Sequence, residues 1–266
     1  MSFYGSSFSY DNIPSELYGL RISSIDSQAV NESMGSSDVE IMNKKIYRRA
    51  TPYFYGSTPS PVLSFEMSAY SAQEIDAEFF QLIQKAYFSS RSFKKLQIFQ
   101  YDMQDVYFNC ILKSPKIVRI GNLLTGIKFE VVCDSPFAWR FPKVTNYTYT
   151  SSVVNDNVIY NNTTDDTGNY TFPSLIITMN NIGGDLSITN SDDNNRIFSF
   201  TGLSPNEILT IDCSLQTISS STGLKRLSNF NKNFFRLLPK VNHLHIAGSI
   251  TSIAMTVQTI AKKIAG

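Results

Sequence analysis

Charged residues are scarce in this chain: they make up 17% of its 266 residues, and 23 basic residues nearly balance 22 acidic ones. A net charge of +1 provides no strong attraction to nucleic acid or to an anionic membrane surface. No stretch approaches the ~18 consecutive apolar residues that span a bilayer. The N-terminal Met1–Gly5 lacks the basic and apolar regions of a secretory signal. We therefore expect no membrane partner and no protein that holds nucleic acid by charge.

Cysteine is also rare. Cys110, Cys133 and Cys213 are odd in number and far apart in the sequence. Cys110 and Cys133 occupy apolar positions in alternating segments, where a buried free thiol is the usual outcome. A disulfide between them would require their two strands to pair. Synthesis in a reducing cytoplasm, with free thiols, is the simpler interpretation.

Motifs for catalysis and metal binding are absent. The sequence has no Gly-x-Ser-x-Gly elbow and no glycine-rich phosphate loop, and no segment indicates the facing carboxylates of a glycosidase. His243 and His245 lie two residues apart, hence on one face of a strand, but zinc sites need three or four ligands. Asp185, Asp192 and Asp193 lack the spacing of a calcium loop and are typical of turns. We predict no enzyme, no catalytic residue, no metal site and no cofactor.

The chain does contain a sharp change of composition. We expect an N-terminal domain over residues 1–141, a polar linker or short hairpin over 142–172, and a C-terminal sandwich over 173–266. The linker is rich in Asn, Thr, Ser, Asp and Tyr, and assigning it to the C-terminal domain is the alternative.

The first domain combines strands with one helix. Residues 62–70, 106–112 and 127–133 alternate apolar and polar side chains, which predicts half-buried strands. Further strands are expected at 18–25, 39–47 and 96–101. The order of strands, helix and strands indicates a β-sandwich or split barrel that carries one helix.

The predicted helix follows Tyr70. Ser71 and Glu74 have the spacing of a capping box, and about 15 helical residues are expected after it. The apolar side chains at helical spacing, which we expect to face the core, are Ile75, Phe79, Leu82, Ala86 and Tyr87.

The second domain is predicted to be a β-sandwich of the jelly-roll type. Short apolar segments recur at intervals of roughly 8–12 residues, separated by turn-forming residues. The strands are expected at 175–179, 186–189, 197–200, 208–211, 234–238, 244–246 and 250–257.

Several short motifs occur along the chain in a characteristic order. They are Pro52–Gly56 before an alternating strand, Cys133–Trp139 at the end of the first domain, and then Gly184–Ile188, Gly202–Glu207, Arg226–Asn231 and Phe234–Leu237. Together with the single helix, this order resembles the siphophage distal tail (Dit-like) protein family, outside residues 142–172. The second domain resembles the galectin-like C-terminal domain of that family. A tryptophan commonly precedes the Arg-Leu pair there, and Phe235 stands in its place here.

The resemblance implies a structural protein of the virion tail, assembled in the cytoplasm of the bacterial host. Such proteins form a homo-hexameric ring with their N-terminal domains and join the tail tube to the tail-tip or baseplate hub. The implied partners are the tail tube protein, the hub protein, the tape measure protein, and receptor-binding or side-fibre proteins anchored on the galectin-like domain. Phage DNA would only pass through the channel.

Two loops and two basic clusters are candidates for contacts between subunits. The loops are residues 27–37 and 51–61, because a cyclic ring needs two different contact patches on each copy. The basic residues are Lys44, Lys45, Arg48, Arg49, Lys94 and Lys95, for which a solvated surface is the simplest interpretation and an interface or channel lining the alternative.

A second hypothesis for the function is a carbohydrate-binding tail module that recognises sugars of the host cell wall. The second sandwich would then bind the sugar. Trp139, the only tryptophan, could stack on a sugar ring, but its position at a strand end favours packing between the domains.

Overall fold

The structure is a computed structural model that describes residues 7–22, 39–45, 47, 50–59, 62–71, 75–101, 103–121 and 123–262. The chain forms two compact units. Unit 1 comprises residues 1–140 and 261–266, and unit 2 comprises residues 141–260. The chain thus leaves unit 1 after Arg140 and returns to it at Ala261. In this division the polar segment 142–172 belongs to unit 2, and the last residues of the chain belong to unit 1.

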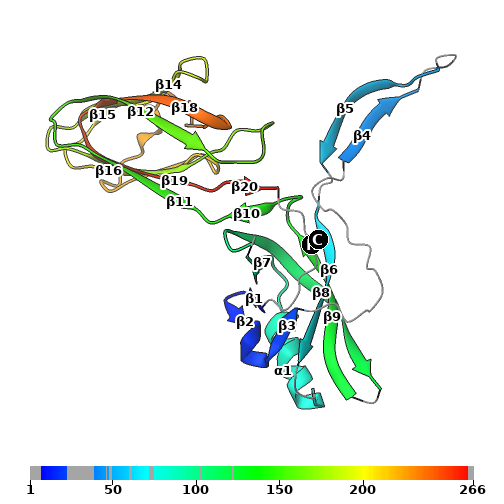
Figure 1. The fold of residues 1–266 in the computed structure, drawn as a ribbon. Coiled ribbons are helices and arrows are strands. Elements are labelled where there is room, and N and C mark those ends of the chain that lie inside the picture. Colours follow the sequence, from blue (N-terminus) through cyan, green and yellow to red (C-terminus); the bar gives the residue numbers. More distant parts are fainter. Residues whose placement is uncertain are drawn as a thin grey trace. The chain divides into compact units, whose positions relative to one another are not determined.

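Unit 1 is built on one large sheet whose central strands run in the order β2-β1-β7-β8-β9-β6-β3 (Figure 1). The neighbouring pairs are antiparallel. β10 pairs with β8 and with β20 at the side of this path. The strands are β1 (Ser7–Tyr10), β2 (Ile13–Pro14), β3 (Leu20–Ile22), β6 (Ser64–Ser71), β7 (Lys94–Phe99), β8 (Val106–Ile120), β9 (Leu123–Cys133), β10 (Ala138–Arg140) and β20 (Ile260–Ala261).

The predicted alternation of unit 1 is confirmed in its central strands. The inward positions of β8 and β9 are buried, whereas the residues between them are more exposed. These inward residues are Val106, Phe108, Cys110 and Leu112 on β8, and Ile127, Phe129, Val131 and Cys133 on β9. The strand expected at 18–25 is found as β3 (Leu20–Ile22), which follows a short 3-10 helix, η1 (Ser15–Tyr18). Residues 23–25 lie outside the described residues.

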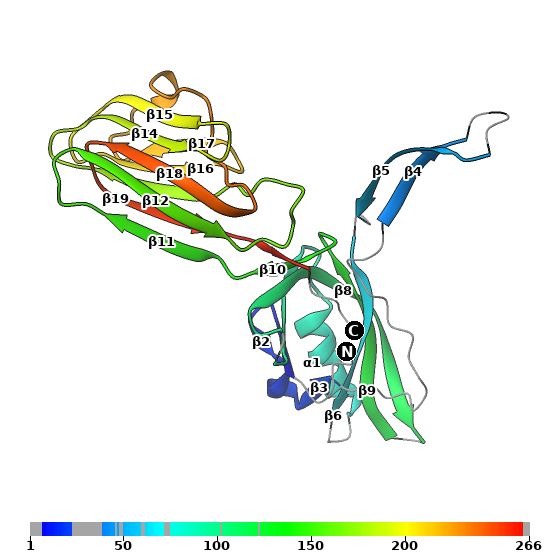
Figure 2. The ribbon, with the colours of Figure 1, turned by 45° about the horizontal axis from the view of Figure 1, so that its top comes forward.

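The single helix, α1 (Ala77–Tyr87), packs its apolar face on this sheet (Figure 2). It is shorter than predicted and begins after Asp76, whose carboxylate accepts a hydrogen bond of 2.7 Å from the Phe79 backbone N–H. The expected N-cap, Ser71, is the last residue of β6, and its partner Glu74 lies outside the described residues. Asp76 is the better cap because it precedes the first helical turn in extended conformation.

The side chains predicted to face the core from this segment are buried or packed against the core, except that of Leu82. Ile83 and Tyr87 are buried, whereas Leu82 is exposed. Successive helical residues are rotated by about 100°, so a face centred on Ile83 turns Leu82 toward solvent. The Tyr87 ring lies 5.5 Å from that of Phe8, and its hydroxyl donates to the Pro14 carbonyl at 3.1 Å. These contacts fix the helix on the sheet.

Unit 2 is a sandwich of two antiparallel sheets whose inner faces share one core (Figure 2). The five-stranded sheet has the order β11 (Lys143–Thr148), β19 (Ile250–Val257), β13 (Ser174–Met179), β16 (Ile208–Asp212) and β17 (Thr217–Ser220). The four-stranded sheet has the order β12 (Val154–Asn162), β18 (Lys240–Gly248), β14 (Gly184–Asn190) and β15 (Arg196–Leu203). A 3-10 helix, η3 (Arg226–Ser228), follows β17.

The polar segment 142–172 contributes two strands to this sandwich. β11 pairs with β19, and β12 pairs with β18 over its whole length. A short hairpin within 153–160 is therefore not formed, because β12 pairs with a strand that lies far along the chain, from Val154 opposite Gly248 to Asn162 opposite Lys240. The predicted strand at 234–238 was also wrong. That segment fills the core with Phe235 and Leu237 and makes only one isolated bridge, between Leu237 and Thr171.

Candidate functional site

Within the described part of unit 1, one two-stranded hairpin pairs with no further strand. β4 (Val39–Lys44) and β5 (Tyr53–Pro59) pair with each other, and among the described residues neither is hydrogen-bonded to another strand. A lone two-stranded hairpin is at best marginally stable in water. Contacts beyond these two strands would therefore stabilise it.

The hairpin exposes large apolar side chains on both faces. Ile41 is 61% exposed, Phe54 67% and Tyr55 63%. Tyr53 and Phe54 follow one another in β5 and so point to opposite faces, and both are exposed. Single apolar residues on a surface are ordinary, but a cluster of this kind marks an interaction site. We call β4 and β5 together the exposed hairpin.

The exposed hairpin replaces one of the predicted loops. Residues 51–61 were expected to be a loop, but residues 53–59 form β5. A register shift between Met42 and Asn43 accommodates Gly56, which has a φ of 130°. The other predicted loop, 27–37, lies outside the described residues.

The two basic clusters do not form one surface feature in the described residues. Lys44 ends β4, and Arg48 and Arg49 lie outside the described residues. In the second cluster, the Lys94 ammonium lies 2.9 Å from the Asp11 carboxylate, and the Lys95 ammonium lies 4.8 Å from the centre of the Tyr107 ring. The second cluster thus makes contacts within unit 1.

The motif Cys133–Trp139 is a hydrogen-bonded turn between β9 and β10. The Asp134 carboxylate accepts from the Asn109 side-chain amide at 2.6 Å and from the Trp139 indole N–H at 3.4 Å. The Ser135 hydroxyl donates to the Phe137 carbonyl at 2.7 Å. Trp139 itself lies in β10 opposite Tyr107. Asp134 and Ser135 of this motif thus hold the turn by which the chain passes from β9 to β10.

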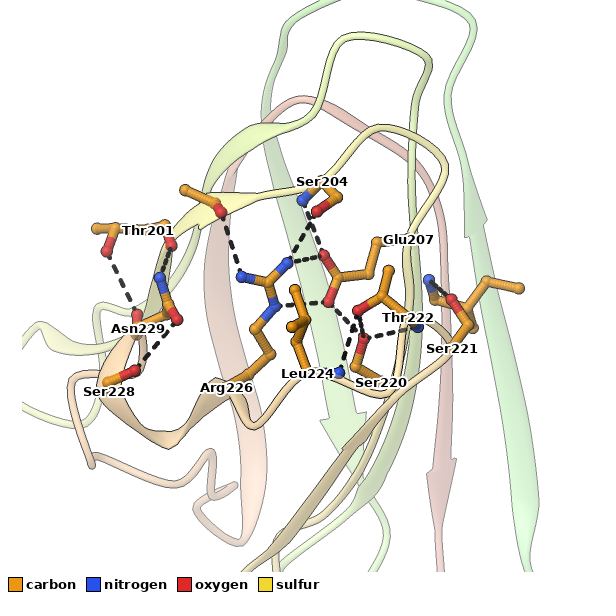
Figure 3. Close-up of polar contacts among 12 residues, drawn as sticks. Thr201, Ser204, Glu207, Ser220, Ser221, Thr222, Leu224, Arg226, Ser228 and Asn229 are labelled. Atoms are coloured by element: carbon orange, nitrogen blue, oxygen red, sulfur yellow. Dashed lines mark hydrogen bonds and ion pairs between the residues drawn. The ribbon is translucent and has the colours of Figure 1, made fainter.

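Two of the motifs in unit 2 meet in a buried ion pair (Figure 3). The Arg226 guanidinium donates to both Glu207 carboxylate oxygens, at 2.7 and 2.6 Å. Their side chains are 7% and 0% exposed. The Ser220 hydroxyl and the Ser204 backbone N–H also donate to this carboxylate. Burial raises the pKa of Glu207, but these hydrogen bonds outweigh it and hold the pKa below its usual value.

The residues after Arg226 cover the edge of the four-stranded sheet. Asn229 donates its side-chain amide to the Thr201 carbonyl, and its own carbonyl accepts from the Thr201 N–H, both at 2.9 Å. The Asn231 side-chain amide likewise donates to the Ile197 carbonyl at 2.8 Å. An uncovered edge strand can pair with another chain. The ion pair and these amides therefore close this edge of unit 2.

The predicted turn aspartates and the two histidines form separate polar contacts. The Asp193 carboxylate accepts two hydrogen bonds from Arg236, whose guanidinium lies 3.7 Å from the centre of the Tyr170 ring. The Asp192 carboxylate accepts from the backbone N–H and the ring of His243, which hold its pKa below the usual value. His245 contacts Asn155 at 2.6 Å. Across the described part of the chain, no three His, Cys, Asp or Glu side chains are grouped as metal ligands.

The outer face of the four-stranded sheet is uncharged over two rows of directly opposed residues. One row is Asn157, His245, Thr189 and Ile197, and the next is Asn155, Ala247, Ser187 and Ser199. These side chains offer amide, imidazole and hydroxyl groups without a fixed charge. We call these two rows the neutral sheet face. Sequence reasoning missed it because its strands lie far apart along the chain.

No described helix has the length and apolar character needed to cross a bilayer. The described architecture is thus a mainly β protein with one α-helix, as predicted, and its exposed features are suited to contacts with other macromolecules.

Comparison with known proteins agrees with this class. Sequence profiles of the phage tail protein N-terminal domain and the phage tail C-terminal domain match residues 3–135 and 137–257. The chain therefore belongs to the phage tail protein family, and it is a structural component of the virion tail.

Solved structures show the same fold at low sequence identity. The Dit protein (gp 19.1) of SPP1, described as a paradigm of the hub adsorption apparatus in phages that infect Gram-positive bacteria, matches with a TM-score of 0.69 and 10% identity. The match covers 96% of this chain and 99% of that one. A chain of the phage P2 baseplate in its activated conformation with Ca matches with a TM-score of 0.52 and 10% identity, over 98% and 100% of the two chains. No curated protein matches the chain by sequence.

The buried ion pair yields a stability prediction. Arg226→Ala should lower the free energy of unfolding of unit 2 by roughly 3–5 kcal/mol, because it leaves the Glu207 carboxylate buried and unpaired. Lys225→Ala removes an exposed basic side chain next to Arg226, and it should change the free energy of unfolding by less than about 0.5 kcal/mol. Chemical denaturation of the two variants measures both values. If both variants lose the same free energy of unfolding, the Glu207–Arg226 pair does not stabilise this edge.

Proposed function

We propose that this protein is the distal tail adaptor of a siphophage: it forms a hexameric ring that joins the tail tube to the tail-tip or baseplate hub. Unit 1 builds the ring, and unit 2 anchors receptor-binding or side-fibre proteins. The family match and the fold shared with Dit and baseplate chains support the location in the tail. The exposed hairpin is the observation that supports assembly.

The argument from the exposed hairpin is physical. A ring with cyclic symmetry needs a heterologous contact, in which one patch of each copy meets a different patch of the next. The hairpin exposes Ile41, Phe54 and Tyr55, which cannot form a core with only two strands. Packing on the neighbouring copy would bury both of its faces. Tail tube and hub proteins would then contact the two ends of the ring, with the tape measure protein and DNA passing through it.

Unit 2 has the features of an attachment module. It has its own hydrophobic core, and the Asn229–Asn231 segment covers the edge of its four-stranded sheet. A module whose β15 edge is covered in this way can present a surface to other proteins without polymerising through that edge. In this proposal the protein acts by positioning its partners and carries out no catalysis.

The ring is tested by the mass of the purified full chain in solution. The chain has a mass of 29.9 kDa, so six copies correspond to roughly 180 kDa. Phe54→Asp places a charge in the hairpin contact and should leave a folded protein of single-chain mass. Light scattering after size exclusion measures both masses.

A matched control separates this effect from a general loss of solubility. Leu215→Asp also charges a highly exposed apolar residue, but in the turn after β16 of unit 2. It should keep the mass of the unaltered protein. If Phe54→Asp and the unaltered protein have the same mass, the hairpin is not the contact that builds the ring.

A carbohydrate-binding tail module remains a second candidate, and the neutral sheet face favours it. Sugars present hydroxyl groups and no charge, and the two rows through Asn157 and Asn155 offer neutral donors and acceptors. Phe235, at the position where a tryptophan is common in the resembling family, is buried in the core and offers no stacking surface. The binding of a sugar would therefore depend on hydrogen bonds to the neutral sheet face.

A glycan array probed with the full chain tests this second candidate. Binding of a defined neutral glycan at millimolar affinity or tighter, lost in Asn157→Ala and kept in Thr217→Ala on the other sheet, is the expected result for a sugar-binding face. No binding to any wall glycan would contradict it and would leave the adaptor proposal unaffected.

A further inference from the structure

Two buried cysteines of unit 1 face each other across the central strands. Cys110 of β8 and Cys133 of β9 are direct partners in the antiparallel register. Both are buried, at 0% and 1% exposure, and both belong to the core of unit 1. Directly opposed residues of antiparallel strands point to the same face of the sheet. The two sulfur atoms therefore lie in the same layer of the core.

The hydrogen-bond pattern places this pair at a non-hydrogen-bonded position. The Cys133 N–H donates to the Leu63 carbonyl at 2.9 Å, away from Cys110. In the next position along the two strands, the Asp134 N–H donates to the Asn109 carbonyl at 2.9 Å. At a non-hydrogen-bonded position the Cα atoms lie about 4.5 Å apart. That spacing is within the range of about 4.4–6.8 Å that a disulfide spans.

The surrounding structure holds the two strands at this spacing. The Asn109 side-chain amide donates to the Asp134 carboxylate at 2.6 Å, beside the cysteine pair. The Tyr10 hydroxyl donates to the Cys110 carbonyl at 3.2 Å. Both thiols are free in the structure. The pair is thus a dithiol that needs little backbone movement to close.

We propose that Cys110 and Cys133 are a latent disulfide, kept as thiols while the tail is assembled inside the bacterium and closed after the virion meets an oxidising medium. This inference rests on the location in the virion tail and is independent of the hexameric ring. Cytoplasmic thiols stay reduced, whereas extracellular proteins keep disulfides.

A peroxide is the class of oxidant that fits the burial of the pair. One thiolate attacks hydrogen peroxide, and a sulfenic acid and hydroxide are formed. The second thiolate then attacks the sulfenic sulfur and displaces hydroxide, so that two thiols and one peroxide give one disulfide and two waters. Burial raises the pKa of Cys133 to about 12 and also raises that of Cys110. Few thiolates are present at neutral pH, so closure is slow.

The disulfide would join the two longest strands of the large sheet. It would restrict the unfolded chain between positions 110 and 133 without altering the fold. The melting temperature of unit 1 should then rise by roughly 5–10 °C. Unit 2, whose only cysteine is Cys213, should melt as before.

The experiment treats the purified full chain with hydrogen peroxide and maps its peptides without reduction. The expected product is a Cys110–Cys133 linked peptide, with Cys213 unlinked, and a melting temperature that dithiothreitol returns to its starting value. Cys133→Ala should show neither change, and Cys213→Ala, which removes the third buried thiol, should show both.

A second route excludes a merely kinetic failure. The reduced, unfolded chain is refolded in oxidised glutathione, where access to the sulfur atoms is unrestricted, and its peptides are mapped in the same way. A linked Cys110–Cys133 peptide in a folded protein, by either route, supports the proposal. Free thiols after both treatments, pairing with Cys213, or a linked protein that melts at a lower temperature would overturn it.

Discussion

Unit 1 depends on the pairing of β8 with β9. These two strands form the centre of the large sheet, and β7 and β6 pair with their outer edges. Their inward side chains, among them Phe108 and Phe129, make the surface on which α1 packs. The end of β9 leads into the turn at Asp134 and Ser135, which carries the chain into β10. These strands are hydrogen-bonded to one another and share one core. Among the described residues of unit 1, the exposed hairpin stands apart from that core.

Unit 2 is stabilised by different interactions from those of unit 1. Its residues 141–260 lie between the two segments of unit 1 in the sequence, and they form a core of their own. The Glu207–Arg226 pair fixes the segment that covers the β15 edge, and four phenylalanines, Phe198, Phe200, Phe230 and Phe235, pack beneath it. The proposed adaptor would use both kinds of unit: one with apolar surface left for assembly, and one with its own core and a covered β15 edge.

The sequence predicted what depends on local periodicity. The alternation in β6, β8 and β9 and the existence of α1 were read correctly because one buried face imposes a period on neighbouring residues. The cap at Asp76, the exposed Leu82 and the strand β5 were missed, because packing decides between local alternatives of similar strength. The Glu207–Arg226 pair and the neutral sheet face join residues far apart in the chain, and no local signal could reveal either.

The central claim is that unit 1 assembles in a ring through a contact that a single copy lacks. Negative-stain images of the purified full chain test it most directly, because they show symmetry as well as size. The account predicts class averages with six-fold symmetry and a central hole, or two such rings stacked on their free faces. Particles the size of one chain at every concentration, with no ring in any class, would contradict it.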